Sequence, residues 1–377
     1  MQSTNRPLIF DLSDPRDAQG FSRLKQGRDV RIVIDHYLAQ QRELFSINNP
    51  TLVFSPDFQA SFEKYIANIL DIDSHGRWIY FPWNGALMHL LEDHDFQRVR
   101  TARNEPLLTR DEQKNLYTTT VAVAGLSVGN SIVTTLVLQG GSRRIKIADH
   151  DSFDLSNLNR IRAGVDMLGV SKIELTARQI YAINPYAEIE LYPEGLTEQN
   201  LSLFLKGADV VVDEMDSLEW KLRLRMAARE HKLPLLSAAD LDHTSIVDIE
   251  RHDIETVPFF LNKLGDVSLE SMRGLDKRAV GRMIALLVGL ENHTPRMLAS
   301  LQSIGKTIVS WPQLGPTAMA GGVYITYCVE RIANNKPLPT SRKILSLEEQ
   351  FDPEYGSAAE RADRASAVSA FKKMFNL

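Results

Sequence analysis

The chain contains 377 residues, and its 43 Lys and Arg against 48 Asp and Glu give a formal net charge of −5. With 44% hydrophobic and 24% charged residues, it has the composition of a globular protein with a large core. This charge balance excludes a general nucleic-acid-binding surface. A single cysteine, Cys328, excludes a disulfide framework and a Cys-based structural zinc site.

Two long uncharged stretches, residues 115–142 and 307–329, are interrupted by glycine or proline. Neither therefore supplies the roughly 20 consecutive apolar residues that a membrane span needs. The first residues lack the apolar segment of a signal peptide. We expect a cytoplasmic protein with no membrane partner.

Residues 1–97 are predicted to form a small N-terminal α+β domain. Apolar residues at helical spacing predict a helix over Phe58–Ile72, and the run Arg77–Pro82 predicts a strand. Ala86–Arg103 is predicted to be an amphipathic helix. No chemistry can be assigned within the first 85 residues, so this domain is expected to serve packing, dimerisation or docking of a peptide.

Residues 98–377 are predicted to form the larger domain, which begins with a repeated pattern of strand, turn and helix. Its short apolar and mostly β-branched runs are Val121–Ala124, Ile145–Asp149, Ile189–Leu191, Val210–Asp213 and Leu235–Ala238. This alternation predicts an α/β fold with a doubly wound, mostly parallel sheet. Helices are expected to follow over Ser268–Leu287, Thr317–Ala333 and Ala365–Phe375.

A small-residue loop follows the first of these strands. Gly125, Ser127 and Gly129 lie in it, directly before the apolar helix predicted over Ser131–Leu138. Small residues allow backbone amides to approach a phosphate, and the helix dipole favours the negative charge. The second strand ends in Asp149 and Asp151, placed to bind ribose hydroxyls. Together these features predict a nucleotide site, with NAD and FAD still open.

Further motifs narrow the class. In chain order they are Ser156–Arg160 (SNLNR), Gly169–Lys172 (GVSK), Ile183–Pro185 (INP) and Asp213–Ser217 (DEMDS). Over residues 98–252 this ordered set resembles the ThiF/E1-like adenylating enzymes, which include MoeB-, ThiF- and microcin-type members and activate carboxylates with ATP. The resemblance implies a Rossmann-like adenylation fold.

The resemblance also implies residue roles. Arg160 and Lys172 would neutralise charge on the phosphates, with Asn157 hydrogen-bonding nearby. Asp216 would hold Mg²⁺, and Asp149 would hold the ribose. ATP and Mg²⁺ are thus the expected cofactors.

Arg103 lies in the run Arg100–Asn104 (RTARN), which resembles the R-x-x-R-Q motif of the family. In the family the second arginine of this motif reaches the ATP of the partner subunit. The resemblance therefore implies a homodimer, with Arg103 acting across its interface.

One departure from the family concerns cysteine. Many members carry a nucleophilic cysteine and paired zinc-ligating cysteines, whereas Cys328 lies in an apolar run and is expected to be structural. We therefore expect no thioester intermediate. The acyl-adenylate would pass directly to a nucleophile on the substrate.

The leading substrate class is a precursor peptide or small protein carrying the carboxylate, as in the peptide-maturing branch of the family. There a glutamate side chain would be activated for cyclisation in peptide-antibiotic biosynthesis. Alternatives are the C-terminus of a sulfur carrier or ubiquitin-like protein, a tRNA-borne carboxylate, an NAD- or FAD-dependent oxidoreductase, and a non-catalytic nucleotide-binding scaffold. Asp240, His243 and His252 remain open as acid–base groups or structural residues.

Overall fold

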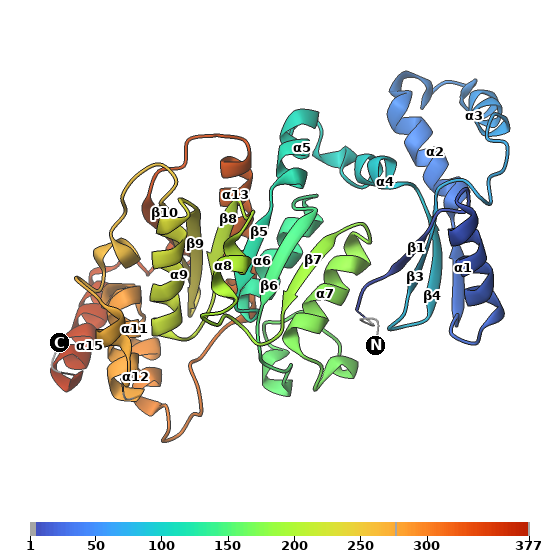
Figure 1. Ribbon diagram of the computed structural model, residues 1–377. Helices are drawn as coiled ribbons and strands as arrows, with labels where there is room; N and C mark the ends of the chain where they lie inside the picture. Colours follow the sequence, from blue (N-terminus) through green and yellow to red (C-terminus); the bar gives the residue numbers. More distant parts are fainter. Residues whose placement is uncertain (1–4, 276, 376–377) are drawn as a thin grey trace. The chain divides into compact units, whose positions relative to one another are not determined.

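The computed structural model describes residues 5–275 and 277–375, and it divides into two compact units (Figure 1). One unit comprises Met1–Lys114 with Ala177–Ala187, and the other comprises Asn115–Thr176 with Glu188–Leu377. The division after Lys114 lies further along the chain than the domain boundary predicted after residue 97.

The smaller unit is built on a four-stranded sheet in the order β1-β3-β4-β2. Its strands are β1 (Leu8–Phe10), β2 (Ile32–Asp35), β3 (Arg77–Phe81) and β4 (Ala86–Leu90). β3 pairs antiparallel with β1 and β4, whereas β2 runs parallel to β4. The helices in this part of the chain are α1 (Pro15–Gln26), α2 (Tyr37–Asn48), α3 (Phe58–Ala67), α4 (Asp93–Arg100) and α5 (Arg110–Thr118).

The helix predicted over Ala86–Arg103 is wrong in its first part, because Ala86–Leu90 is strand β4 and helix α4 begins only at Asp93. Within β4, His89 is 1% exposed and its ring stacks on Trp78, with centroids 4.5 Å apart. Because His89 is polar but buried, the residues of β4 do not show the alternation of apolar and polar residues that indicates a strand. The predicted helix at Phe58 and the predicted strand at Arg77 are confirmed.

The larger unit contains a seven-stranded sheet in the order β11-β10-β9-β8-β5-β6-β7. Its strands are β5 (Val121–Ala124), β6 (Arg144–Ala148), β7 (Glu188–Tyr192), β8 (Val210–Asp213), β9 (Pro234–Leu241), β10 (Thr244–Arg251) and β11 (Ser341–Ser346). The strands β7, β6, β5, β8 and β9 are parallel, and β10 and β11 complete the sheet in antiparallel register. The predicted doubly wound, mostly parallel α/β sheet is therefore confirmed.

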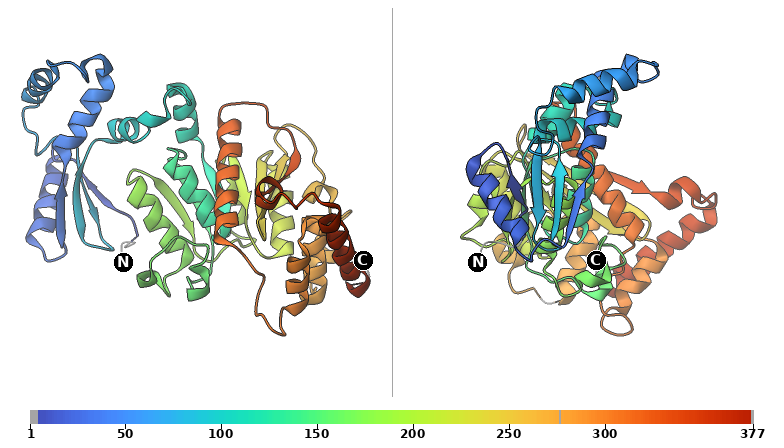
Figure 2. Two further views of the ribbon diagram at one scale, coloured as in Figure 1. Left: turned by 180° about the vertical axis from the view of Figure 1, so that it is seen from behind. Right: turned by 90° about the vertical axis from the view of Figure 1, so that its right-hand side faces the viewer.

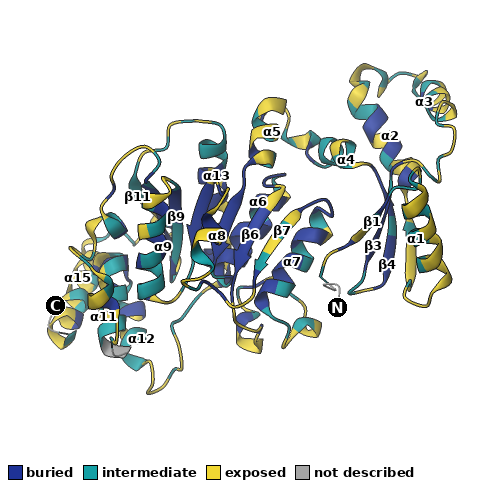
Figure 3. Ribbon diagram, in the orientation of Figure 1, coloured by how far each residue is buried: buried dark blue, intermediate teal, exposed yellow. Residues whose placement is uncertain are grey.

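Burial explains why these apolar runs form the centre of the sheet. Every residue of β5 and of β8 is buried, and the sheet interior is correspondingly dark in Figure 3. Helices α6 (Val128–Leu138) and α13 (Gly315–Ala333) pack on each other, and α13 also contacts β9 (Figure 2). Helices α8 (Leu201–Leu205) and α9 (Leu218–Glu230) pack together, with α9 against β8 and β9. Strands buried in this way read as continuous apolar runs.

The remaining helices are α7 (Lys172–Ile183), α10 (Leu269–Met272), α11 (Lys277–Val288), α12 (Pro295–Ser303), α14 (Leu347–Phe351) and α15 (Ala358–Phe375). The single helix predicted over Ser268–Leu287 is divided into α10 and α11, because Gly274 adopts a positive φ of 66° and Arg273 leaves the helical region. The other two predicted C-terminal helices are confirmed as α13 and α15. Among the described residues, none of the helices is long and apolar enough to cross a membrane.

Candidate nucleotide site

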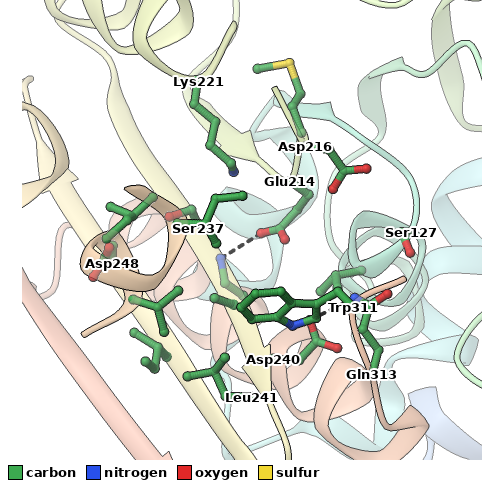
Figure 4. Close-up of a pocket in the computed structure, with 18 of the residues that line it drawn as sticks. Ser127, Glu214, Asp216, Lys221, Ser237, Asp240, Leu241, Asp248, Trp311 and Gln313 are labelled. Carbon is green, nitrogen blue, oxygen red and sulfur yellow. Dashed lines mark hydrogen bonds between the residues drawn. The ribbon is translucent and has the colours of Figure 1, made fainter. Parts of the chain in front are cut away.

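The larger unit contains a pocket of about 740 Å³ next to the carboxyl ends of β5, β8 and β9 (Figure 4). β5 lies between β6 and β8, so the strand order reverses at this point, which is where ligands bind in open α/β sheets. Ser127, Arg160, Lys172 and Asp216 line this pocket together. The pocket therefore brings together predicted site residues that are widely separated in the sequence.

The turn from β5 into α6 requires glycine. Gly125 has a positive φ of 91°, and a Cβ atom placed on it would lie 2.3 Å from the backbone oxygen of Glu214. A Cβ atom at Gly129 would lie 3.0 Å from the Val123 side chain. The loop is thus pressed against the end of β8, and its backbone enters helix α6 at Ser127, whose side chain makes no capping hydrogen bond.

Asp149, directly after β6, is 8% exposed and holds the loop between β5 and α6, residues 125–127, which we call the phosphate loop after its expected role. Its Oδ2 accepts a hydrogen bond of 2.6 Å from the Leu126 amide, and its Oδ1 accepts one of 2.8 Å from the Asp151 amide. Asp151 in turn pairs with Lys172, whose Nζ lies 2.7 Å from Oδ2. This hydrogen bond lowers the pKa of Asp151, so its carboxylate stays charged and holds the ammonium group in place.

The loop that follows β6 positions Arg160. Its Nε donates to the Ser127 hydroxyl at 2.9 Å, and its terminal nitrogen donates to the carbonyl of Ser156 and to the Asn159 side chain. Asn157 is buried and accepts a hydrogen bond from the Asp154 amide, which closes a capping box. In this structure Asn157 therefore shapes the loop that carries Arg160.

Two carboxyl groups follow β8 and extend from the same loop in Figure 4. Asp216 is exposed, whereas Glu214 is partly exposed and accepts a hydrogen bond of 2.7 Å from the Ala238 amide on β9. Burial raises the pKa of the Glu214 carboxyl well above its usual range. Glu214 was absent from the predicted site, although its place directly after a buried strand could have indicated it.

The three open acid–base groups lie in different surroundings. Asp240 lines the pocket at 8% exposure, and its Oδ1 accepts from the Gln313 amide at 3.1 Å. His252 is buried beside Glu250, 3.5 Å away, and is not among the residues lining the pocket. His243 lies in the β9–β10 turn, where its ring nitrogen and the carboxylates of Asp242 and Glu348 lie within 4.8 Å of one another.

Arg103 belongs to the smaller unit, where it is exposed and lines a separate cavity of about 420 Å³. Cys328 is 5% exposed within α13, and burial raises the pKa of its thiol to about 11. A thiol in this environment is not a ready nucleophile. The predicted structural role of Cys328 therefore agrees with its burial.

The donor set in the pocket fits a nucleoside triphosphate. Ser127 and Val128 at the N-terminus of α6 line the pocket together with the cationic side chains of Arg160 and Lys172, and the glycine turn lies directly before them in the chain. The exposed carboxylate of Asp216 and the partly exposed carboxyl group of Glu214 also line the pocket, and oxygen ligands of this kind suit Mg²⁺.

The fold and this pocket define an α/β domain with a glycine-containing loop at the point where the strand order reverses. More narrowly, residues 100–249 match the ThiF family, so the chain carries a ThiF family domain. The resemblance predicted from the motifs is thereby confirmed.

Several curated proteins are similar to parts of this chain. An uncharacterized protein of Mycobacterium tuberculosis is 34% identical over 277 residues, covering 73% of this chain and 38% of that protein. The tRNA threonylcarbamoyladenosine dehydratase of Bacillus subtilis is 30% identical over 139 residues, with coverage of 36% and 55%. The ubiquitin-like modifier-activating enzyme 5 of Drosophila willistoni is 29% identical, with coverage of 30% and 31%. The chain thus spans less than two thirds of the length of each of these relatives.

Similar solved structures include PaaA, at 18% identity and a TM-score of 0.48, covering 67% of this chain and 78% of that one. MccB of E. coli with ATP is 15% identical at a TM-score of 0.48, with coverage of 68% and 79%. The tRNA N6-threonylcarbamoyladenosine dehydratase TcdA of E. coli is 17% identical at a TM-score of 0.45, with coverage of 63% and 95%.

Proposed function

We propose that this chain is an enzyme that adenylates a carboxylate with ATP in the presence of Mg²⁺. The observation that carries the proposal is the convergence of Ser127, Arg160, Lys172 and Asp216 on one pocket beside a glycine turn. An oxidoreductase using the same glycine turn would have no need of this cationic and acidic set.

In the proposed reaction a carboxylate oxygen of the substrate attacks the α-phosphorus of ATP. The bond to the bridging oxygen breaks, and pyrophosphate leaves with the electron pair. Arg160 and Lys172 would neutralise the negative charge that develops on the phosphate oxygens. Asp149, with Asp151 and Asn157 fixing the loops around it, would hold the ribose, while the amides at Gly125 and Gly129 would face the phosphates.

Asp216 would hold the Mg²⁺ ion, because its exposed carboxylate lies in the pocket on the loop after β8. When bound, the ion supplies positive charge that offsets the charge of the phosphate oxygens. Glu214 lies beside Asp216 on the same loop, but its hydrogen bond to Ala238 already fixes it to β9.

The acyl-adenylate would pass directly to a nucleophile on the substrate, with release of AMP. Burial of the only cysteine supports this route over a thioester intermediate. We propose a glutamate side chain of a ribosomally made precursor peptide as the substrate, activated for ring closure in peptide-antibiotic maturation. We further propose a cytoplasmic homodimer in which Arg103 reaches the partner's nucleotide.

Two other substrate classes are alternatives to the precursor peptide. The names of the relatives from Bacillus subtilis and Drosophila willistoni refer to a tRNA nucleoside and to a ubiquitin-like modifier. A tRNA-borne carboxylate and the C-terminus of a ubiquitin-like or sulfur-carrier protein are therefore the alternatives to be tested.

The test is an analysis of nucleotide products from α-labelled ATP and Mg²⁺ with three separate substrate panels. These are glutamate-containing peptides, carrier-protein C-termini and carboxylate-modified tRNA. AMP and pyrophosphate released with one panel, and lost in Arg160→Ala, would support adenylation and identify that class. Release of ADP, or NAD binding without ATP consumption, would overturn the proposal. Tight ATP binding with no pyrophosphate release from any panel would favour a non-catalytic scaffold.

A further inference from the structure

The pocket has two chemically different sides. The side described above carries the phosphate loop and the cationic residues. The opposite side is apolar and is built from β9, β10, α11 and the loop before α13. We call this side the apolar wall, and its residues are Leu241, Ile246, Val280, Ile284, Val288 and Trp311.

The order of strands separates the apolar wall from the proposed ribose site. Asp149 ends β6, which lies on one side of β5, whereas β8, β9 and β10 lie on the other side of β5. A nucleotide with its ribose at Asp149 and its phosphates at the loop after β5 would point its α-phosphate toward β8 and β9. The apolar wall therefore lies beyond the phosphates, on the side from which the carboxylate must approach.

The charged groups around the apolar wall are already paired. Asp248 forms two hydrogen bonds with Arg342, of 2.7 and 2.6 Å, and Arg342 also donates to the carbonyl of Leu287. Lys221 pairs with Asp213 at 3.3 Å, so its charge is compensated as well. Around the apolar wall, within the part of the chain that the structure describes, Arg342 and Lys221 are thus each engaged by a carboxylate and are not left to pair with a second acidic group on the substrate.

Asp240 strengthens this discrimination. It lies between the two sides of the pocket, and its Oδ2 is enclosed without a hydrogen-bond partner among the described residues. Burial raises the pKa of both Asp240 and Glu214, so this part of the pocket disfavours negative charge, and a second charged carboxylate would be disfavoured there too, whereas an apolar group would gain from leaving water. The cavity of about 740 Å³ must also hold the triphosphate, so the apolar group has the size of a side chain rather than of a long acyl chain.

We propose that the apolar wall is the acyl subsite, and that the reacting carboxylate is carried next to an apolar or aromatic side chain. This inference rests on the proposed function and adds the chemistry of the substrate segment. In a precursor peptide it selects a glutamate that is flanked by an apolar residue over one flanked by acidic residues.

The test measures the binding of stable acyl-adenylate mimics, which need no knowledge of the natural substrate. Three acylsulfamoyl adenosines carry an acetyl, a 3-phenylpropanoyl or a succinyl group, and their Kd values are measured by calorimetry on the full chain. We expect the phenylpropanoyl compound to bind at least about tenfold more tightly than the acetyl compound, as filled apolar pockets do. We expect the succinyl compound to gain nothing.

Two variants on one helix supply a matched comparison. Ile284→Asn places a polar group on the apolar wall, and we expect the tenfold preference to disappear. Leu286→Asn makes the same chemical change on α11 at a residue that is 37% exposed and outside the pocket lining, and we expect the preference to remain. Val280→Thr introduces only a hydroxyl into the apolar wall. It replaces Ile284→Asn as the test variant if Ile284→Asn does not fold, and we expect it to reduce the preference for the phenylpropanoyl compound. Thermal unfolding of each variant monitors the fold.

The outcomes separate this inference from the proposed function. If ATP and the acetyl compound bind but the phenylpropanoyl compound gains nothing, or if the succinyl compound binds most tightly, the acyl subsite is wrong and the nucleotide site stands. If ATP and all three compounds fail to bind the folded protein, the proposed function itself is wrong. Loss of the preference in Leu286→Asn would likewise overturn the assignment of the wall.

Discussion

The guanidinium Nε of Arg160 lies 2.9 Å from the hydroxyl oxygen of Ser127, so the loop after β6 is joined to the N-terminus of α6 inside the pocket. Because the Ser127 hydroxyl accepts from Arg160 and makes no capping hydrogen bond to α6, it leaves the first amides of this helix available at the pocket. This contact therefore fixes the guanidinium group of Arg160 beside the first turn of α6.

Replacing Arg160 with alanine removes the cation nearest the phosphate loop. We expect kcat for pyrophosphate release to fall about 100- to 1000-fold, the range for losing one donor to a developing negative charge. Arg144→Ala is the matched control, because Arg144 is an exposed arginine at the amino end of β6, away from the pocket. Equal rates in the two variants would contradict the assignment of Arg160.

Asp216→Asn removes one negative charge without changing the size of the side chain. If Asp216 holds Mg²⁺, the Mg²⁺ concentration for half-maximal activity should rise about tenfold or more. Titration of activity with MgCl₂ measures this shift. Asp166→Asn, at another exposed aspartate, should leave the titration unchanged. An unaltered midpoint in Asp216→Asn would remove the metal assignment.

Gly125→Ala tests the close approach of the phosphate loop to β8. Its new Cβ atom would meet the Glu214 oxygen at 2.3 Å, in addition to the strain of a positive φ. Gly169→Ala carries a similar strain at φ 82° but meets nothing within 4 Å. Denaturant unfolding should show a loss of about 1–2 kcal/mol for Gly169→Ala and a loss larger by ~1–3 kcal/mol for Gly125→Ala. Similar losses in both variants would argue against the close contact.

Glu214→Gln should make stability less dependent on pH. Burial raises the pKa of Glu214, so the folded state binds the proton more tightly than the unfolded state does. The stability linked to this proton is present at low pH and is lost as the pH rises through the raised pKa. A glutamine keeps an acceptor for the Ala238 amide, so Tm of the variant relative to the wild type should increase as pH rises. A difference that stays constant with pH, as expected for the exposed control Glu354→Gln, would contradict this.

Cys328→Ala tests whether the acyl group passes through a thioester. With its pKa raised to about 11, the buried thiol should react slowly with iodoacetamide in the native protein and rapidly after unfolding. We expect the variant to form the final product at a rate within about twofold of the wild type. Adenylation that continues while product formation stops would instead identify Cys328 as an acyl acceptor.

The sequence predicted those features whose physical cause is local. The runs around Val121 and Val210 are apolar because both strands are buried on both faces. Such continuous apolar runs are typical of parallel sheets. Gly125 was predicted to lie in a small-residue loop after the first strand of the larger domain, and its positive φ agrees with a loop position. The order of the motifs then indicated the family.

Features that depend on distant residues were not predicted. β10 and β11 pair through residues such as Asp248 and Arg342, which are 94 positions apart, and no local pattern records such a pairing. Strand β4 was wrongly predicted as a helix. Its residue His89 is buried against the ring of Trp78 on the neighbouring strand β3, and this contact is not visible in the local sequence. The hydrogen bond that Glu214 accepts from the Ala238 amide on β9 likewise could not be read from the residues around Glu214, although its position after a buried strand could.

The pairing of Arg342 with Asp248 has a consequence for synthesis of the chain on the ribosome. The strand that carries Asp248 emerges long before the arginine that pairs with it. A nascent chain that ends before β11 therefore lacks the partner of a carboxylate that is 5% exposed in the complete structure. Arg342 also fixes the end of α11, which carries part of the apolar wall. The apolar wall is therefore completed only when the last part of the chain has been made.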